Sequence, residues 1–185
     1  MIKFGVDVNS ERGIDNICEL LPKLPLDAVC LLPNLEMCDA INQAMLSKID
    51  SPEILLEAED NFNCPQYFRK RINKILKDDN NTNVNVGVAR TIILKIGSKA
   101  MLRRNIDISI GLVNGAIGII TTIVKDAKHR VEQIKIRLIS GEEHSISRMD
   151  YKFVLMDNIY INRKQFPLCL SDGITIHKSQ GLSFW

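Results

Sequence analysis

Four hydrogen-bond donors lie within five positions near the end of the chain. They are Thr175, His177, Lys178 and Ser179. Hydroxyl, imidazole and ammonium groups all pair well with phosphate oxygens. Gln180 adds a neutral amide that can contact a terminal phosphate or an attacking water, and Gly181 lets the backbone approach closely. This composition predicts a loop that contacts phosphate groups.

The loop follows an apolar run at residues 167–176, which predicts a buried strand interrupted at Asp172-Gly173. We therefore expect the loop to start where a strand ends and a helix begins. In open α/β sheets ligands bind at the carboxyl ends of strands, and a helix N-terminus exposes N–H groups that suit phosphate. His177 and Lys178 alone would also fit a solvated loop. Within the string Thr175–Ser183, phosphate contact is the favoured interpretation of these two residues.

A second α/β element is predicted near the start of the chain. Residues 27–32 form an apolar run before Pro33, typical of a buried strand. Asn34 is a good helix N-cap, and apolar residues then recur at helical spacing through residues 35–49. A strand followed by a capped helix is half of an α/β unit. We expect Asn34 to act as a cap first and as a ligand contact second.

The middle of the chain changes from helical to two-residue periodicity at residue 91. A helix opening at Pro65 and an exposed, Asn-rich connection at residues 78–87 are expected before this point. Short β-rich runs then follow at residues 91–96, 99–104, 116–124, 132–139, 144–149 and 152–157. Short strands separated by turns favour a small barrel. Because α/β elements stand on both sides, the order favours a barrel inserted into an α/β domain.

Two groups within the β-rich region have competing interpretations. Gly111, Asn114 and Gly115 favour turn chemistry, since Asn-Gly is a strong hairpin signal, with ligand contact as the alternative. For Arg103 and Arg104, an exposed strand edge and a ligand contact both remain open.

Composition and charge limit the classes of protein to which the chain can belong. The 185 residues are 45% hydrophobic and 25% charged, ordinary for one globular domain or one domain with an insert. Residues 1–62 carry a net charge of −8, whereas the rest of the chain carries +10. This split fits either a basic face for a polyanion or an ordinary solvated surface.

The five cysteines are scattered and predict reduced thiols, and no metal site is predicted. No apolar run approaches the ~18 residues of a membrane span, and no secretory signal is evident. We therefore expect an intracellular protein without a membrane partner.

Three parts of the chain resemble the Pif-family (petite integration frequency) DNA helicases of superfamily 1B and their RecD-type relatives. The string Thr175–Ser183 is similar to the family's fifth motif. The segment that opens the family's small inserted barrel is similar to residues 94–97, 101–107, 111–115 and Gly118. Leu32-Pro33-Asn34 with Ile41-Asn42 resembles the fourth motif. The likeness covers roughly residues 25–50 and 90–185.

The resemblance implies an α/β fold, the second RecA-like motor domain of a P-loop NTPase, with an SH3-like barrel inserted. Residues 1–90 would be the first part of that domain plus a connection, residues 91–160 the barrel, and residues 161–185 the return to the motor domain. It also implies a 5′–3′ DNA helicase that uses ATP and Mg²⁺ in the complete enzyme. Single-stranded DNA and an N-terminal RecA-like domain, missing here, would be its partners. DNA repair, recombination and telomere maintenance are implied as roles, and nucleus or mitochondrion as location in a eukaryote.

The resemblance also assigns site residues. The residues that would contact DNA are Asn34, Thr175, His177, Lys178 and Ser179. Gln180 and Gly181 would couple DNA to the nucleotide, and Arg103, Asn105 and Asn114 would be further DNA contacts on the barrel.

The sequence departs from the family pattern in several places. It contains no G-x-x-x-x-G-K-[ST] phosphate loop and no paired Asp-Glu metal motif, and the sixth motif with its arginine finger would lie beyond Trp185. We therefore expect no catalytic residue in the chain, no cofactor bound by it alone, and an inactive isolated polypeptide. Ser171-Asp172-Gly173 stands where the family has apolar or aromatic residues.

The sequence leaves further interpretations of the function open. One is a helicase of Helitron transposons, which tend to carry Asn at position 177 and Gln at position 182, so His177 and Leu182 favour the Pif branch. A non-catalytic nucleic-acid-binding module and an inert remnant also stay open.

Overall fold

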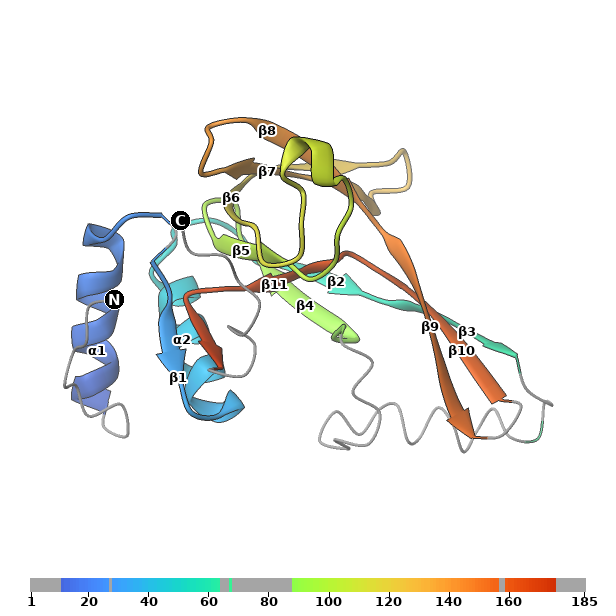
Figure 1. The fold of residues 1–185 in the computed structure, drawn as a ribbon, viewed down its shortest axis with the longest axis horizontal. Helices are drawn as coiled ribbons and strands as arrows, with labels where there is room; N and C mark the ends of the chain where they lie inside the picture. The colour runs from blue at the N-terminus through green and yellow to red at the C-terminus, as the bar shows by residue number, and fades with distance from the viewer. Residues whose placement is uncertain (1–10, 27, 64–66, 68–87, 157–158, 176–185) are drawn as a thin grey trace.

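We describe a computed structural model of the chain, covering residues 11–26, 28–63, 67, 88–156 and 159–175. A small α/β layer lies on one side of the molecule (Figure 1). Its elements are α1 (Glu11–Leu20), the 3₁₀ turn η1 (Leu21–Lys23), β1 (Cys30–Leu32), α2 (Leu35–Ser47) and β12 (Gly173–Thr175). β1 and β12 form a parallel pair with Leu31 opposite Ile174, and α2 packs on it. No helix of the described residues is long and apolar enough to cross a membrane.

A five-stranded antiparallel sheet forms the centre of the β-rich part. Its strands, in spatial order, are β11 (Leu168–Leu170), β5 (Lys99–Leu102), β6 (Ile117–Lys125), β7 (Val131–Leu138) and β8 (Glu143–Ser147). A glycine in β6 is required for close approach of two strands, since a Cβ on Gly118 would lie 2.5 Å from the carbonyl oxygen of Arg137. The β6–β7 ladder is irregular after Ile120 and after Val124, where its register shifts.

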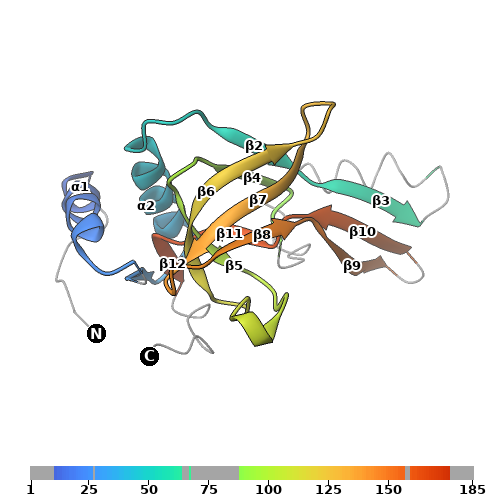
Figure 2. The same cartoon turned by 90° about the horizontal axis from the view of Figure 1, so that it is seen from above.

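Two smaller sheets complete the β-rich part. β2 (Ile54–Glu57) pairs with β4 (Thr91–Leu94), and β3 (Glu59–Asn63), β10 (Ile159–Gln165) and β9 (Met149–Met156) form a three-stranded ribbon in that order. The ribbon extends away from the five-stranded sheet in two perpendicular views (Figures 1 and 2).

Separate hydrophobic clusters stabilise the two parts. In the β-rich part, one cluster joins the five-stranded sheet to β2 and β4, with Leu56, Ile120, Ile136 and Phe166 among its fully buried members. A second cluster joins α1, α2 and β1 through residues such as Ile17 and Ile41. Burying an aliphatic side chain stabilises a fold by about 1.5–3 kcal/mol. A small third cluster of Met101, Ile117 and Ile174 lies between the five-stranded sheet and β12.

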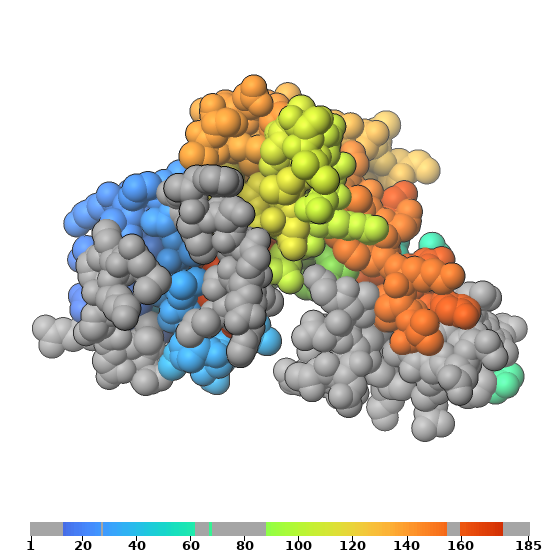
Figure 3. All heavy atoms as spheres, in the orientation of Figure 1, coloured from blue at the N-terminus to red at the C-terminus, as the bar shows by residue number. Residues whose placement is uncertain are grey.

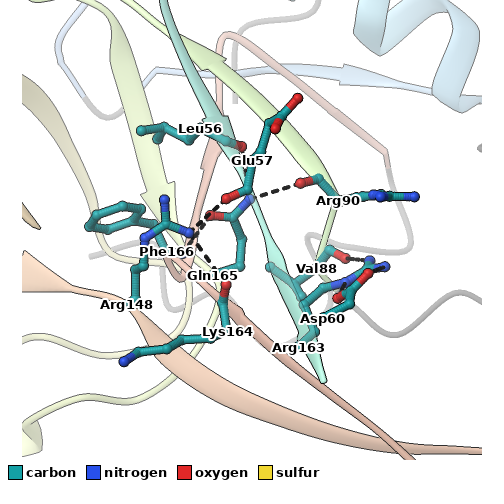
Figure 4. A network of polar contacts seen from close by, with 10 residues as sticks. All are labelled: Leu56, Glu57, Asp60, Val88, Arg90, Arg148, Arg163, Lys164, Gln165 and Phe166. Carbon is teal, nitrogen blue, oxygen red and sulfur yellow. Dashed lines mark hydrogen bonds and ion pairs between the residues drawn. The ribbon is translucent and has the colours of Figure 1, made fainter. Parts of the chain in front are cut away.

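A buried polar network ties the ribbon to the neighbouring strands (Figure 4). Arg163 on β10 makes two hydrogen bonds to the Asp60 carboxylate, at 2.8 and 3.0 Å, and donates to the Val88 carbonyl. The Gln165 side chain donates to the carbonyls of Leu56 and Arg90. The network therefore joins β10 to β2, β3 and the segment before β4.

Most of the local predictions are confirmed. Residues 30–32 and 35–47 are the strand and helix expected there, and all six β-rich runs contain a strand, β4 to β9. The run 167–176 divides into β11 and β12, which belong to different sheets. β2, β3 and β10 were not predicted. The expected helix from Pro65 and the connection at residues 78–87 lie almost wholly outside the described residues.

Candidate nucleic-acid interface

The carboxyl ends of β1 and β12 meet at one edge of the parallel pair. Thr175, the last residue of β12, pairs in register with Leu32, the last residue of β1. The chain leaves β1 through Pro33 and reaches Asn34, the N-cap of α2. The fold thus brings Asn34 and Thr175, which are distant in sequence, to the same edge. This is where an open α/β sheet binds ligands.

The two residues at this edge are not equally available to a ligand. Asn34 is exposed, and its side-chain oxygen accepts a 2.9 Å hydrogen bond from the Met37 N–H, as the sequence predicts for a cap. Thr175 is only 7% exposed, so it presents little surface. The rest of the predicted phosphate-binding string lies outside the described residues, namely His177, Lys178, Ser179, Gln180 and Gly181.

A buried amide fixes the strand that leads to this edge. The Asn42 side chain on α2 donates to the Gly173 carbonyl at 3.0 Å and accepts from the Gly173 N–H at 2.9 Å. A Cβ at Gly173 would lie 3.1–3.2 Å from Leu32 and from the Cys38 backbone. Asn42 and a residue without a side chain at position 173 therefore set how closely α2 and β12 pack. Asn42 lies in a stretch noted from the sequence, but only the fold shows what its side chain contacts.

The triplet Ser171-Asp172-Gly173, which leads into β12, is buried. Ser171 and Asp172 are almost fully buried, and the Asp172 carbonyl accepts a 2.7 Å hydrogen bond from the Cys30 N–H. Lys99 lies 3.4 Å from the Asp172 carboxylate and donates to the Ala28 carbonyl at 2.9 Å. Burial raises the pKa of Asp172, and the charge of Lys99 partly offsets this. The ion pair of Lys99 and Asp172 thus links β5 to the α/β layer.

The predicted barrel contacts lie on one loop between β5 and β6, residues 103–116 (the 103–116 loop). The Asn105 side-chain oxygen accepts a 2.7 Å hydrogen bond from the Asn114 N–H, so these two predicted site residues lie together. Gly111 and Gly115 have φ of 76° and 93°, the left-handed region that favours glycine. Turn chemistry, the first interpretation of this stretch, is confirmed.

The two arginines at the root of this loop differ in their surroundings. The Arg103 N–H donates to the Pro167 carbonyl at 2.8 Å, and its side chain is half-buried. Arg104 is exposed, donates to the Asp150 carbonyl at 2.9 Å and lies 5.5 Å from the centre of the Tyr151 ring. The family resemblance points to Arg103 as the DNA contact, yet Arg104 is the more accessible cation of the pair.

The part of the chain that the structure describes offers no metal site. No group of three or more His, Cys, Asp or Glu side chains in that part could hold a metal ion. Among the described residues, the site residues predicted from the sequence lie at two features, the edge at Asn34 and Thr175 and the 103–116 loop.

Part of the chain is similar to a known family, and most of it is similar in fold to solved structures. Residues 79–123 match the family model described as DNA helicase Pif1, 2B domain. This segment is similar to a Pif1 2B domain. The match contains the 103–116 loop entirely, together with β4, β5 and most of β6. No curated protein matches the sequence significantly.

Solved Pif1 structures share the fold of most of the chain. A Bacteroides Pif1 in complex with ADP-AlF4 is similar over 95% of this chain, with a TM-score of 0.63 and 22% identity. A Pif1 helicase from Candida albicans is similar over 93%, with the same TM-score and identity. A Bacteroides Pif1 bound to ssDNA is similar over 92%, with a TM-score of 0.56 and 21% identity. The chain spans 38%, 42% and 40% of these proteins. The family model thus covers residues 79–123, and the solved neighbours share the fold of most of the chain.

Proposed function

We propose that this chain is the single-stranded-DNA-binding part of an ATP-dependent 5′–3′ DNA helicase. It would correspond to the second RecA-like domain with the SH3-like barrel of the family inserted between β1 and β12. The observation that carries the proposal is the edge formed by Asn34 and Thr175. In the sequence, the string predicted to bind phosphate continues from Thr175. The 2B match and the likeness to a Pif1 bound to ssDNA support it.

In this proposal DNA phosphates meet backbone N–H groups at the start of α2 and donors of the string after Thr175. The amide N–H groups at a helix N-terminus carry partial positive charge, which favours an anion. Gln180 and Gly181 would face a nucleotide held mainly by another RecA-like domain. An intracellular site, nuclear or mitochondrial in a eukaryote, belongs to the same proposal.

The first test is binding of a labelled single-stranded oligonucleotide, measured by fluorescence anisotropy at several salt concentrations. We expect dissociation constants of roughly 10⁻⁴–10⁻⁶ M, since phosphate contacts dominate non-specific binding. Replacing His177 and Lys178 together by Ala should weaken binding and lower the salt slope by about one unit. The control, Lys3→Ala with Lys23→Ala on the acidic N-terminal part, should bind as the parent does. Equal binding by the parent and the His177 and Lys178 variant would remove the string from the interface.

A non-catalytic nucleic-acid-binding module and a Helitron-type remnant are the competing proposals. Reading the gene in both directions separates these cases. A Walker sequence upstream and an arginine-bearing motif downstream support the helicase. Stop codons in both directions support a remnant, and an open frame without either motif supports the binding module.

A further inference from the structure

The tip of the 103–116 loop exposes three isoleucines within five residues. Ile106, Ile108 and Ile110 are 38%, 72% and 44% exposed. The loop forms a ridge on the face shown in the space-filling view, where it is yellow-green (Figure 3). Single exposed apolar residues are common on proteins, whereas a cluster on one projection usually marks a contact surface.

The fold holds this tip in one shape. The Asp107 carboxylate accepts hydrogen bonds from the N–H and hydroxyl of Ser109, at 2.9 and 2.5 Å, and caps the short 3₁₀ turn η3 (Ile108–Ile110). The same hydrogen bonds, above all that from the Ser109 hydroxyl, lower the pKa of Asp107, so the cap is ionised at neutral pH. Asp107 pairs with Leu112, which is buried in the β-rich core. The isoleucines are therefore presented by a loop with a defined conformation.

We propose that Ile108, flanked by Ile106 and Ile110, contacts the bases of single-stranded DNA while the backbone is held elsewhere. The proposal deepens the proposed function and rests on it. Apolar side chains that insert between or against bases are a recurrent mode of nucleic-acid contact. The face of a DNA base is apolar, whereas the phosphates of the DNA backbone are anionic. The isoleucines at the loop tip would contact the base, and exposed Arg104 at the loop root would contact a phosphate.

Two further observations favour a base over a protein as the occupant. Three isoleucines make a small projection, whereas a stable protein interface buries about 800 Å² on each partner. Aromatic residues also make up only 5% of the chain, so few rings are available for stacking. Aliphatic contacts on a rigid loop would fill that role with little sequence preference.

The test compares Ile108→Ser with Leu55→Ser in the full chain. Leu55 on β2 is 56% exposed and lies outside the loop, so both variants remove a large exposed aliphatic side chain. The probe is an oligothymidine with a single 2-aminopurine, whose fluorescence reports a change in base contact. We expect Ile108→Ser to bind about fivefold to tenfold more weakly, because the variant would lose the apolar contact between one aliphatic side chain and the base.

Salt dependence separates this contact from the phosphate contacts. An apolar contact releases no counterions, so Ile108→Ser should leave the salt slope unchanged, while Arg104→Gln should lower it. Parent-like affinity and 2-aminopurine signal in Ile108→Ser would overturn the proposal, as would an equal loss in Leu55→Ser. If the parent chain fails to bind the oligonucleotide at all, the proposed function fails with it. If the parent binds and only the Ile108 result is negative, the base contact alone fails.

Discussion

At the scale of single residues, the edge that carries the candidate interface depends on one amide. The buried side chain of Asn42 forms hydrogen bonds with both the N–H and the carbonyl of Gly173. Asn42→Ala would leave the Gly173 N–H and carbonyl without this partner, which costs about 1–3 kcal/mol for each buried group. We expect urea denaturation to show a loss of this order. The control is Asn16→Ala, which removes an exposed amide on α1 and should stay within about 0.5 kcal/mol of the parent.

Asp172 gives a second prediction, on the pH dependence of stability. Its pKa is raised in the folded state, chiefly by burial, above the ordinary value of 3.8. The folded protein then holds this proton more tightly than the unfolded chain does. Relative to Asp172→Asn, the parent should lose stability as pH rises from below 3.8 through the raised folded value. Chemical denaturation of both proteins from about pH 3.5 to about pH 7 measures this difference, and a difference that is constant with pH would contradict it.

Residue-scale prediction from sequence succeeded where the interaction is local. The Asn34 cap involves a partner three positions away, and the glycine turns of the 103–116 loop follow from backbone preferences. The Asn42–Gly173 and Lys99–Asp172 contacts join positions far apart in the chain. No local pattern specifies such pairs, so they became visible only in the fold.

At the scale of elements, the projecting ribbon is held by the buried pair of Arg163 and Asp60. Both side chains are almost inaccessible, at 5% and 6% exposure. Arg163→Met would leave the Asp60 carboxylate buried without its partner, which costs about 3–5 kcal/mol. The double variant Arg163→Met with Asp60→Leu removes both charges and should recover much of that loss. Equilibrium unfolding of the single and double variants checks this, and additive losses would contradict it.

Two of the strands missed by sequence analysis, β3 and β10, share a physical reason. β3 has the sequence EDNFN, which lacks an apolar alternation. Its Asp60 forms an ion pair with Arg163, which is distant in sequence. β10 contains Arg163 and Gln165, polar residues that the fold buries in the network described above. Hydrophobic periodicity detects strands whose buried face is apolar, such as β6 and β7, and fails where the buried face is polar and satisfied.

At the scale of the whole molecule, we expect the purified chain to be silent as an ATPase. The sequence has no phosphate loop, and an arginine finger alone contributes about 10³-fold or more to phosphoryl transfer. Phosphate release in the presence of Mg²⁺ and single-stranded DNA should equal that of a buffer blank. Turnover above the blank that persists through further purification would contradict this expectation.

The parallel pair of β1 and β12 has a consequence for the order of folding. Its partners, Cys30 and Gly173, are separated in sequence by α2 and the whole β-rich part of the chain. Closing so long a flexible loop is entropically unfavourable, and contacts of such sequence separation slow folding. If the β-rich part condenses first, through neighbouring strands such as β6, β7 and β8, it shortens the effective loop. On a ribosome, this pair forms only after residue 175 has left the exit tunnel, so the α/β layer would be the last part to close.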